Sequence, residues 1–174
     1  MTTETFARIL NRAEYVGRIR EVNEIMSTKT EARKTAIIDM YEATNRGNIE
    51  PLRALLADDF VSYGGAGFQD LHGAQAFIDL WGTFTAAFPD LTFEVQQIVV
   101  GDDDFAAVRG LQRGTHLGNF LGMVPPTGKR VTWTGTAIFR FNADGKIVER
   151  WQDLDNLSLF QQLGVIPAFG AAQG

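Results

Sequence analysis

The sequence predicts an α+β fold in which helices pack on one face of a curved antiparallel sheet and enclose a cavity. Up to residue 88 most apolar residues recur at helical spacing, whereas from residue 91 onward they alternate with polar residues at the period of a β-strand. The later strands follow one another through short turns, which makes antiparallel neighbours. Helices segregated onto one face of such a sheet form an α+β cone.

The first half of the chain predicts a series of amphipathic helices. Residues 4–26 form one, and residues 27–30 interrupt the pattern and offer caps for a second helix over 30–46. A third follows Asn48, with Pro51 in its first turn. We therefore expect a helical extension over residues 1–30, a cone domain over 31–165 and a frayed tail over 166–174.

Composition narrows the possible functions. The chain has 174 residues, a net charge of −5, no cysteine and only two histidines, His72 and His116. An acidic chain without a dense basic patch is a poor binder of nucleic acid or anionic membranes. Without cysteines and with so few histidines, a metal site is not expected. No apolar run can span a bilayer, and the N-terminus lacks a signal-peptide pattern, so we expect a cytoplasmic protein.

A long hairpin over residues 130–155 organises the second half. If Ala143 to Gly145 form its loop, cross-strand partners have numbers that sum to 288. One face then carries Thr136 and Ile138 together with Arg150 and Gln152. The other is mainly aromatic and carries Trp133, Phe139 and Trp151, with Glu149 and Asp153 among them.

Other segments suggest walls for a cavity. The helix predicted over residues 73–88 carries five large apolar side chains, Trp81 among them, more than packing alone requires. The segment over 116–127 is punctuated by glycine and proline and carries Phe120 and Met123. Its apolar tips need burial, so we expect a flap over the cavity.

At the level of motifs the chain resembles the SnoaL-like family, whose fold is a cone like that of nuclear transport factors. The resemblance rests on RGTHLGNFLGMVPPTGKRV (113–131), FRFNADGKIVERW (139–151), and Asp155 followed by QQLG (161–164). It covers about residues 31–165. It implies a polyketide ring cyclase without a cofactor, in which a buried Asp acts as general acid and base in an intramolecular aldol reaction.

The resemblance also implies where the site lies. With the DGK turn as anchor, the cyclase Asp falls at Gln152 and its companion His at Arg150. The Gln and His of the neighbouring strand fall at Thr136 and Ile138, and a cavity Asn falls at Ser62, next to Tyr63. None of these polar cyclase residues is kept, and a carboxamide cannot exchange a proton near neutral pH.

Two functions remain open at this point. In the first, Arg150 is a fixed cation, Gln152 and Thr136 form hydrogen bonds with a hydrophobic carbonyl compound or polycycle, and His116 carries the proton. In the second, the protein binds an apolar small molecule without catalysis, Arg150 pairs with a carboxylate, and His116 holds the flap. An epoxide hydrolase is disfavoured, because residues 105–115 supply arginines but no carboxylate.

The aromatic face predicts a homo-oligomer. If the mixed face lines the cavity, Trp133, Phe139 and Trp151 need cover, most simply from a second subunit. Glu149 and Asp153 lie about 13 Å apart by strand rise, too far to act as a carboxylate pair. They suit the wet rim of a subunit interface.

Overall fold

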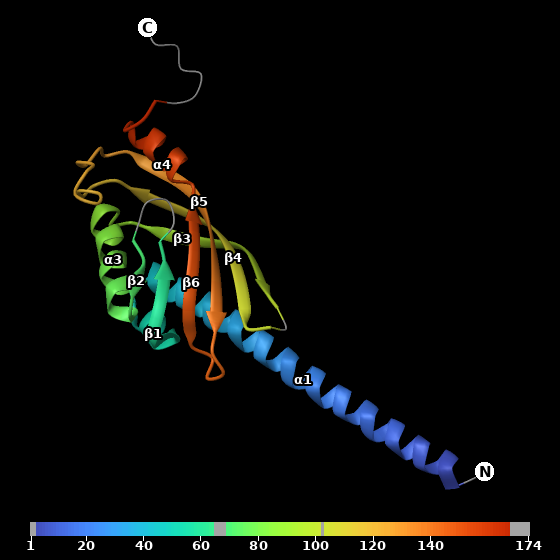
Figure 1. Ribbon diagram of the computed structural model, residues 1–174. Helices are drawn as coiled ribbons and strands as arrows, with labels where there is room; N and C mark the ends of the chain where they lie inside the picture. Colours follow the sequence, from blue (N-terminus) through green and yellow to red (C-terminus); the bar gives the residue numbers. More distant parts are fainter. Residues whose placement is uncertain (1–2, 65–68, 102, 168–174) are drawn as a thin grey trace.

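A computed structural model describes residues 3–64, 69–101 and 103–167. It contains the helices α1 (Thr3–Asn45), α2 (Glu50–Leu55), α3 (Ala74–Ala87) and α4 (Asn156–Leu163). The first half of α1 stands clear of the rest of the molecule, and its second half runs along the sheet (Figure 1). The predicted frayed tail lies mostly outside the described residues.

Six strands form one sheet, in the order β2-β1-β6-β5-β4-β3. They are β1 (Leu56–Tyr63), β2 (Leu71–His72), β3 (Thr92–Val100), β4 (Phe105–Thr115), β5 (Arg130–Phe141) and β6 (Ile147–Leu154). The four strands of the second half are antiparallel neighbours, as predicted. β1 instead lies parallel to β6, so the sheet is mixed. The α+β class and the additional N-terminal helix are confirmed.

The helix break predicted at residues 27–30 is wrong, because α1 is continuous through it. Serine and threonine can cap a helix, but Thr28 instead bonds within it, its hydroxyl donating to the Glu24 carbonyl at 2.9 Å. The proposed boundary between extension and cone therefore falls inside one helix. Met26 and Thr30 are the first described residues of α1 that are partly buried.

The hairpin register is correct only next to the turn. Asn142 pairs with Lys146 and Phe141 with Ile147, as the loop length predicts. The register then shifts by one residue, and Arg140 pairs with Glu149 and Phe139 with Arg150. A bulge on β6 at Val148 causes this shift, because it adds one residue to that strand. Beyond it Arg150 and Gln152 share a face with Trp133 and Phe139 of β5, and not with Thr136 and Ile138 as predicted.

The cavity face of the sheet therefore combines half of each predicted face. From β5 it takes the aromatic set, including Trp133 and Phe139, and from β6 it takes Arg150 and Gln152. Trp133 and Phe139 are buried within one chain, so the prediction that they need a second subunit is wrong. Trp151 lies on the outer face.

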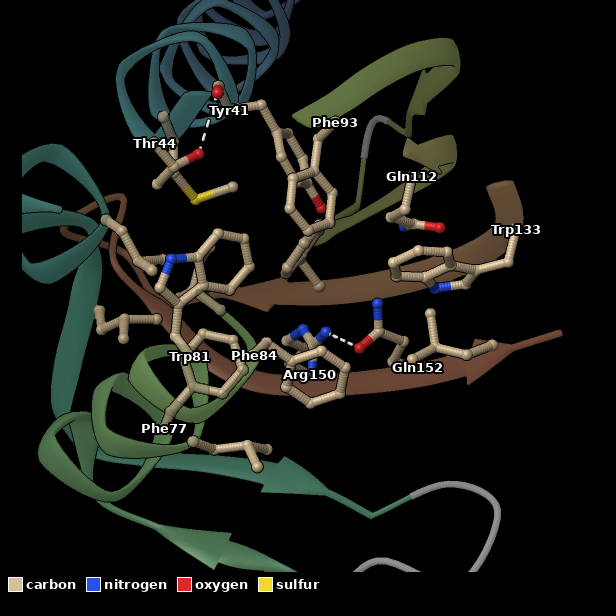
Figure 2. Close-up of a pocket in the computed structure, with 17 residues that line it drawn as sticks. Tyr41, Thr44, Phe77, Trp81, Phe84, Phe93, Gln112, Trp133, Arg150 and Gln152 are labelled. Carbon is tan, nitrogen blue, oxygen red and sulfur yellow. Dashed lines mark hydrogen bonds between the residues drawn. The ribbon is translucent and has the colours of Figure 1, made fainter. Parts of the chain in front are cut away.

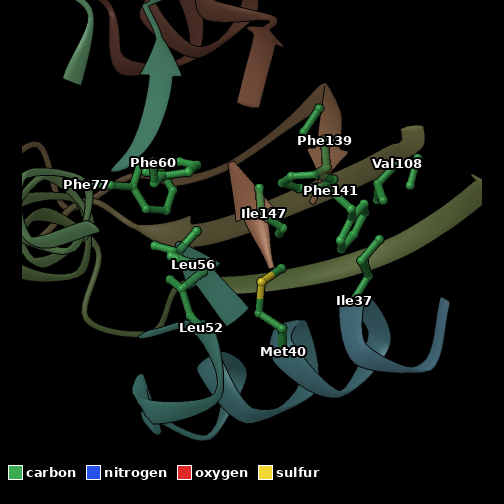
Figure 3. Close-up of a cluster of buried hydrophobic side chains, with 12 residues drawn as sticks. Ile37, Met40, Leu52, Leu56, Phe60, Phe77, Val108, Phe139, Phe141 and Ile147 are labelled. Carbon is green, nitrogen blue, oxygen red and sulfur yellow. The ribbon is translucent and has the colours of Figure 1, made fainter. Parts of the chain in front are cut away.

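Two clusters of apolar side chains pack on the inner face of the sheet, the face toward the cavity. The larger lies between α1, α2, α3 and the sheet and includes Ile37, Met40, Phe77 and Phe139 (Figure 3). The second lies at the other end of the sheet, where Phe88, Phe120 and Trp133 pack against α4. The space between the two clusters contains the candidate site.

Candidate functional site

A cavity opens between the two clusters, enclosed by the sheet, α1 and α3 (Figure 2). Its empty volume is about 770 Å³, which includes open solvent at the mouth. Most of its wall is apolar or aromatic. The lining residues are Met40, Tyr41, Thr44, Leu52, Leu56, Phe77, Leu80, Trp81, Phe84, Phe93, Gln112, Trp133, Phe139, Ile147, Arg150, Gln152 and Leu154. The described lining contains no carboxylate and no imidazole.

Arg150, which is half-buried, places a cation in this apolar wall. Its guanidinium lies over the Phe77 ring, 4.7 Å from the centroid, and Nη1 donates to Ser62 Oγ at 3.0 Å. Nη2 donates to the Gln152 side-chain oxygen. Burial lowers the pKa of Arg150 to about 10, so the side chain is still charged at neutral pH. A buried cation held by neutral partners is suited to receive a negative charge from a ligand.

Tyr41 faces the same space from α1. The side chain of Asn45 fixes this part of the helix against β3, because it donates to the Phe93 carbonyl and accepts from the Phe93 amide, both at 2.7 Å. The Tyr41 ring packs against the Phe93 ring at 5.8 Å, and its hydroxyl points into the cavity (Figure 2). Burial raises the pKa of Tyr41, which the charge of Arg150 partly offsets. Tyr41 is therefore a neutral hydrogen-bond donor at neutral pH.

A second, smaller hollow of about 430 Å³ adjoins the first. Both hollows are lined by Leu80, Phe84, Arg150, Gln152 and Leu154. The second is otherwise lined mainly by polar residues and glycine: Ser62, Tyr63, Gly64, Gln69, Leu71 and Asn156. Arg150 and Gln152 thus lie between an apolar space and a more polar one.

Several residues predicted for the site do line these spaces. Arg150, Gln152 and Trp81 line the main cavity, and Trp81 stacks on Phe93 at 4.8 Å. Ser62 is buried and lines the second hollow. Tyr63 borders that hollow too, but its hydroxyl is directed outward and donates to Glu149 at 2.8 Å.

Thr136 and Ile138 do not share a face with Arg150 and Gln152. They are exposed on the outer face of β5, where Thr136 pairs with Asp153 and Ile138 with Trp151. The bulge is the reason, because the extra residue shifts the pairing by one and puts the side chains of Arg150 and Gln152 on the face opposite to Thr136 and Ile138.

The flap residues also lie elsewhere. The segment after β4 is held to the end of α3, where the amides of Leu117 and Gly118 donate to the Ala87 carbonyl. Phe120 is buried in the second cluster, behind Phe84, and Met123 is 70% exposed. Neither lines the cavity, so the prediction of a flap over it is wrong.

His116 is fully buried and does not line either hollow. Its ring packs between Phe88 and Phe120, and its Nδ1 accepts from the Thr127 amide at 3.3 Å. Burial lowers its pKa, so the ring is neutral at neutral pH. The placement fits the alternative in which His116 holds the turn.

Four polar residues of the wall were not predicted from the sequence: Tyr41, Thr44, Gln112 and Trp133. Tyr41 lies on the apolar stripe of its helix, where packing explains a tyrosine equally well. Gln112 does leave a signal. It occupies an inward position of β4, in a row with Ala106, Val108, Gly110 and Gly114, where a large polar side chain is unusual.

The fold and the site together define a class of protein, an α+β cone that encloses an apolar cavity with a few convergent polar groups. Comparison with protein families gives the particular family. Residues 35–163 match the model of the SnoaL-like polyketide cyclases, and the chain belongs to this family. A search of curated proteins found no match.

Solved structures agree with this assignment. The chain is 32% identical to AclR, a putative hydroxylase from Streptomyces galilaeus, with a TM-score of 0.70 over 80% of this chain and 85% of AclR. It is 37% identical to IdmH, a putative polyketide cyclase from Streptomyces antibioticus, with a TM-score of 0.63 over 76% of this chain and 98% of IdmH. A putative SnoaL-like polyketide cyclase from a Jannaschia species, 22% identical, has a TM-score of 0.70 over 79% of this chain and 95% of that one, which supports the fold alone.

The described residues contain neither a candidate membrane-spanning helix nor a cluster of metal ligands. None of their helices is both long and apolar enough to cross a membrane. Within the same residues, no three His, Asp or Glu side chains gather as metal ligands would.

Proposed function

We propose that this protein is a cytoplasmic, cofactor-independent enzyme that promotes enolate chemistry, either cyclisation or isomerisation, on a hydrophobic carbonyl compound or polycycle. The half-buried cation of Arg150 in the apolar wall carries the proposal. In a site of low polarity, a fixed positive charge stabilises an enolate oxygen far more than it would in water. Tyr41 adds a neutral donor directed into the same space.

The residues divide the chemistry as follows. The C–H bond next to the carbonyl breaks, its electron pair forms the C=C bond of the enolate, and the π pair of the carbonyl moves to the oxygen, where Arg150 and Tyr41 stabilise the negative charge. Gln152 replaces the acid and base of the cyclases and orients Arg150 through their hydrogen bond. Since the described wall offers no carboxylate or imidazole, the proton passes to water, and the substrate must itself be acidic.

That lack of a base favours a second candidate, a binding protein for an apolar small molecule. The two functions differ in a simple reaction. 2-Tetralone is a bicyclic ketone whose protons next to the carbonyl exchange with deuterium in D2O, and proton NMR follows the exchange. The enzyme should accelerate this exchange above the buffer rate, whereas a binding protein should not.

Three variants sharpen the test. Arg150→Met should remove most of the acceleration, about a hundredfold, since it removes the main charge that stabilises the enolate. Arg140→Met is the matched control, an arginine on the outer face of the same hairpin that pairs with Glu149. Gln152→Asp should raise the rate, because it supplies a carboxylate base. If the wild type and Gln152→Asp both exchange at the buffer rate while the protein binds 2-naphthoate, the binding function stands instead.

We also propose that a second copy of the chain covers the outer face of the sheet. A row of cross-strand partners crosses that face in register: Tyr63, Trp151, Ile138, Ala107 and Val99. Ile138 is 42% and Val99 67% exposed. Charges of both signs flank this row, Arg140 with Glu149 on one side and Arg109 with Asp153 on the other. An apolar row with mixed charges at its rim can match itself across a two-fold axis.

A further inference from the structure

Two buried polar atoms beside the cavity have no hydrogen-bond partner. Gln112 on β4 and Trp133 on β5 are cross-strand partners, and both side chains line the cavity (Figure 2). They are 4% and 2% exposed. Gln112 Oε1, an acceptor, and Trp133 Nε1, a donor, bond to nothing among the described residues. Proteins seldom leave such atoms unpaired, because each costs free energy, so we expect a ligand to pair with them.

The Gln112 amide packs against two glycines of the neighbouring backbone. Gly110 and Gly135 are partners on the same face, and a Cβ at either would lie 3.8 or 3.5 Å from Gln112 Nε2. These are ordinary van der Waals distances, so the amide lies directly against the backbone of both glycines. A Cβ at Gly135 would also lie 2.5 Å from Leu154 Cδ2, so Leu154 packs down onto this glycine. Leu154 also packs against the cluster that contains Trp133.

Leu154 therefore closes this end of the cavity. It lines both hollows, and the two unpaired atoms are sealed from solvent beside it. The end of a leucine side chain can move by a change of rotamer without moving the backbone. A ligand group could then reach the two atoms.

The two atoms select the chemistry of that group. The indole N–H can only donate, and the amide oxygen can only accept. One hydroxyl satisfies both, since its oxygen accepts from Trp133 and its hydrogen donates to Gln112. A carbonyl or carboxylate would leave Gln112 Oε1 facing another acceptor, and an ammonium would leave the indole facing another donor.

The position of this pair along the sheet gives the shape of the ligand. Arg150 pairs with Phe139, which lies six residues after Trp133 on β5. The two backbone positions are about 20 Å apart along the strand, but the guanidinium extends toward Trp133 as far as Gln152, which pairs with Ala137, four residues after Trp133. We propose that Gln112 and Trp133 form a hydroxyl-recognition subsite, and that the ligand is an elongated aromatic or polycyclic compound with its anionic or carbonyl group at Arg150 and a hydroxyl at the far end. The proposal rests on the proposed function for the Arg150 end only.

A matched ligand series tests the subsite. Isothermal titration calorimetry compares 2-naphthoate with 6-hydroxy-2-naphthoate, and anthracene-2-carboxylate with its 6-hydroxy derivative, so that two ligand lengths are covered. The hydroxyl should improve affinity about tenfold in at least one length, the value of one net hydrogen bond. The 6-methoxy analogues, which cannot donate to Gln112, should lose this gain.

Variants assign the gain to the two residues. Gln112→Leu and Trp133→Phe should each abolish it while 2-naphthoate still binds, and Leu154→Ala should preserve or increase it. Thermal melting checks that each variant folds, and the two single variants provide independent tests. If the carboxylates bind but the hydroxyl gives no gain at either length, water alone satisfies the pair and the subsite is overturned. If no carboxylate binds but 2-naphthol binds better than naphthalene, the subsite holds and the role of Arg150 fails.

Discussion

Arg150 and Ser62 are direct partners across the parallel β6–β1 pair, and Arg150 Nη1 donates to Ser62 Oγ at 3.0 Å. Three neutral contacts surround the guanidinium, namely this hydroxyl, the Gln152 amide oxygen and the Phe77 ring. They fix its position without neutralising its charge. The fold thus keeps a cation in an apolar cavity, which costs stability and is useful only if a ligand meets it.

The first prediction concerns that cost. The pKa of Arg150 falls from its ordinary value to about 10 on folding, so its burial subtracts stability on the order of 3 kcal/mol at neutral pH. The folded pKa lies below the unfolded one, so this loss is fully present below pH 10 and fades as the pH rises from 10 toward the unfolded pKa. Arg150→Met removes the charge but keeps an apolar side chain. Loss of the hydrogen bonds to Ser62 and Gln152 offsets part of this gain, so we expect the melting temperature at pH 7.5 to rise by about 2–6 °C.

The same variant should bind an anionic ligand more weakly, although its melting temperature rises. Arg150→Met should weaken 2-naphthoate at least tenfold, because a charge-assisted hydrogen bond is lost, and leave 2-methylnaphthalene nearly unaffected. Arg140→Met serves as the control and should change neither value. A variant with a lower melting temperature and intact naphthoate affinity would show that Arg150 is structural.

The second prediction concerns Ser62 as a positioning residue. Ser62→Ala removes the hydroxyl that holds Nη1, so the guanidinium gains rotational freedom while its charge remains. Naphthoate affinity should fall about five- to tenfold, the value of one hydrogen bond to a charged group. Ser62→Thr keeps a hydroxyl and should recover most of the affinity. Failure of Thr to rescue binding, in a variant that melts like the wild type, would assign the effect of Ala to packing.

The sequence alone predicts much of this architecture for a physical reason. Periodicity reports which face of a helix or strand is buried, and the turn residues Asn142 to Gly145 fix the local pairing. Both signals are local, so the α+β class and the antiparallel order of β3 to β6 follow from them. The parallel pairing of β1 with β6 depends on contacts far apart in sequence, which no local pattern encodes.

The site was harder to predict because one extra residue in β6 changes which side chains of β5 and β6 share a face of the sheet. The bulge at Val148 leaves no clear mark in the sequence, yet it moves Thr136 and Ile138 out of the site and puts Trp133 and Phe139 on the same face of the sheet as Arg150. His116 illustrates a different limit. A histidine next to a glycine-rich loop suggests a proton carrier, but only the packing of Phe88 and Phe120 around it reveals a buried, neutral ring.

The third prediction tests that neutral state. The Thr127 amide donates to His116 Nδ1, so protonation there would break this bond and bury a charge. The folded pKa of His116 lies below its ordinary 6.5. Its stabilising contribution is therefore present above pH 6.5 and is lost as the pH falls through the lower folded pKa. Urea unfolding of the wild type should give a smaller free energy at pH 5.5 than at pH 7.5.

His116→Gln should flatten this pH dependence, even if it lowers stability at every pH, because the variant cannot take up the proton. His72 is exposed, so His72→Gln should keep the wild-type slope. The exchange of 2-tetralone should be unchanged in folded His116→Gln, since His116 does not line the cavity. A large loss of exchange without a loss of stability would restore His116 as the proton carrier.

The last prediction concerns the second copy on the outer face. Ile138 lies in the middle of the apolar row, between Trp151 and Ala107, and is not needed for the inner core. If two sheets meet there, Ile138→Asp buries a charge at their centre, and light scattering at micromolar concentration should change from a dimer mass to a monomer mass. Val22→Asp introduces the same charge at an exposed apolar position on the projecting part of α1, and this control should leave the dimer intact. A wild-type chain that is already monomeric contradicts the proposal outright, whereas a dimer broken by Val22→Asp and not by Ile138→Asp would move the interface from the sheet to the helix.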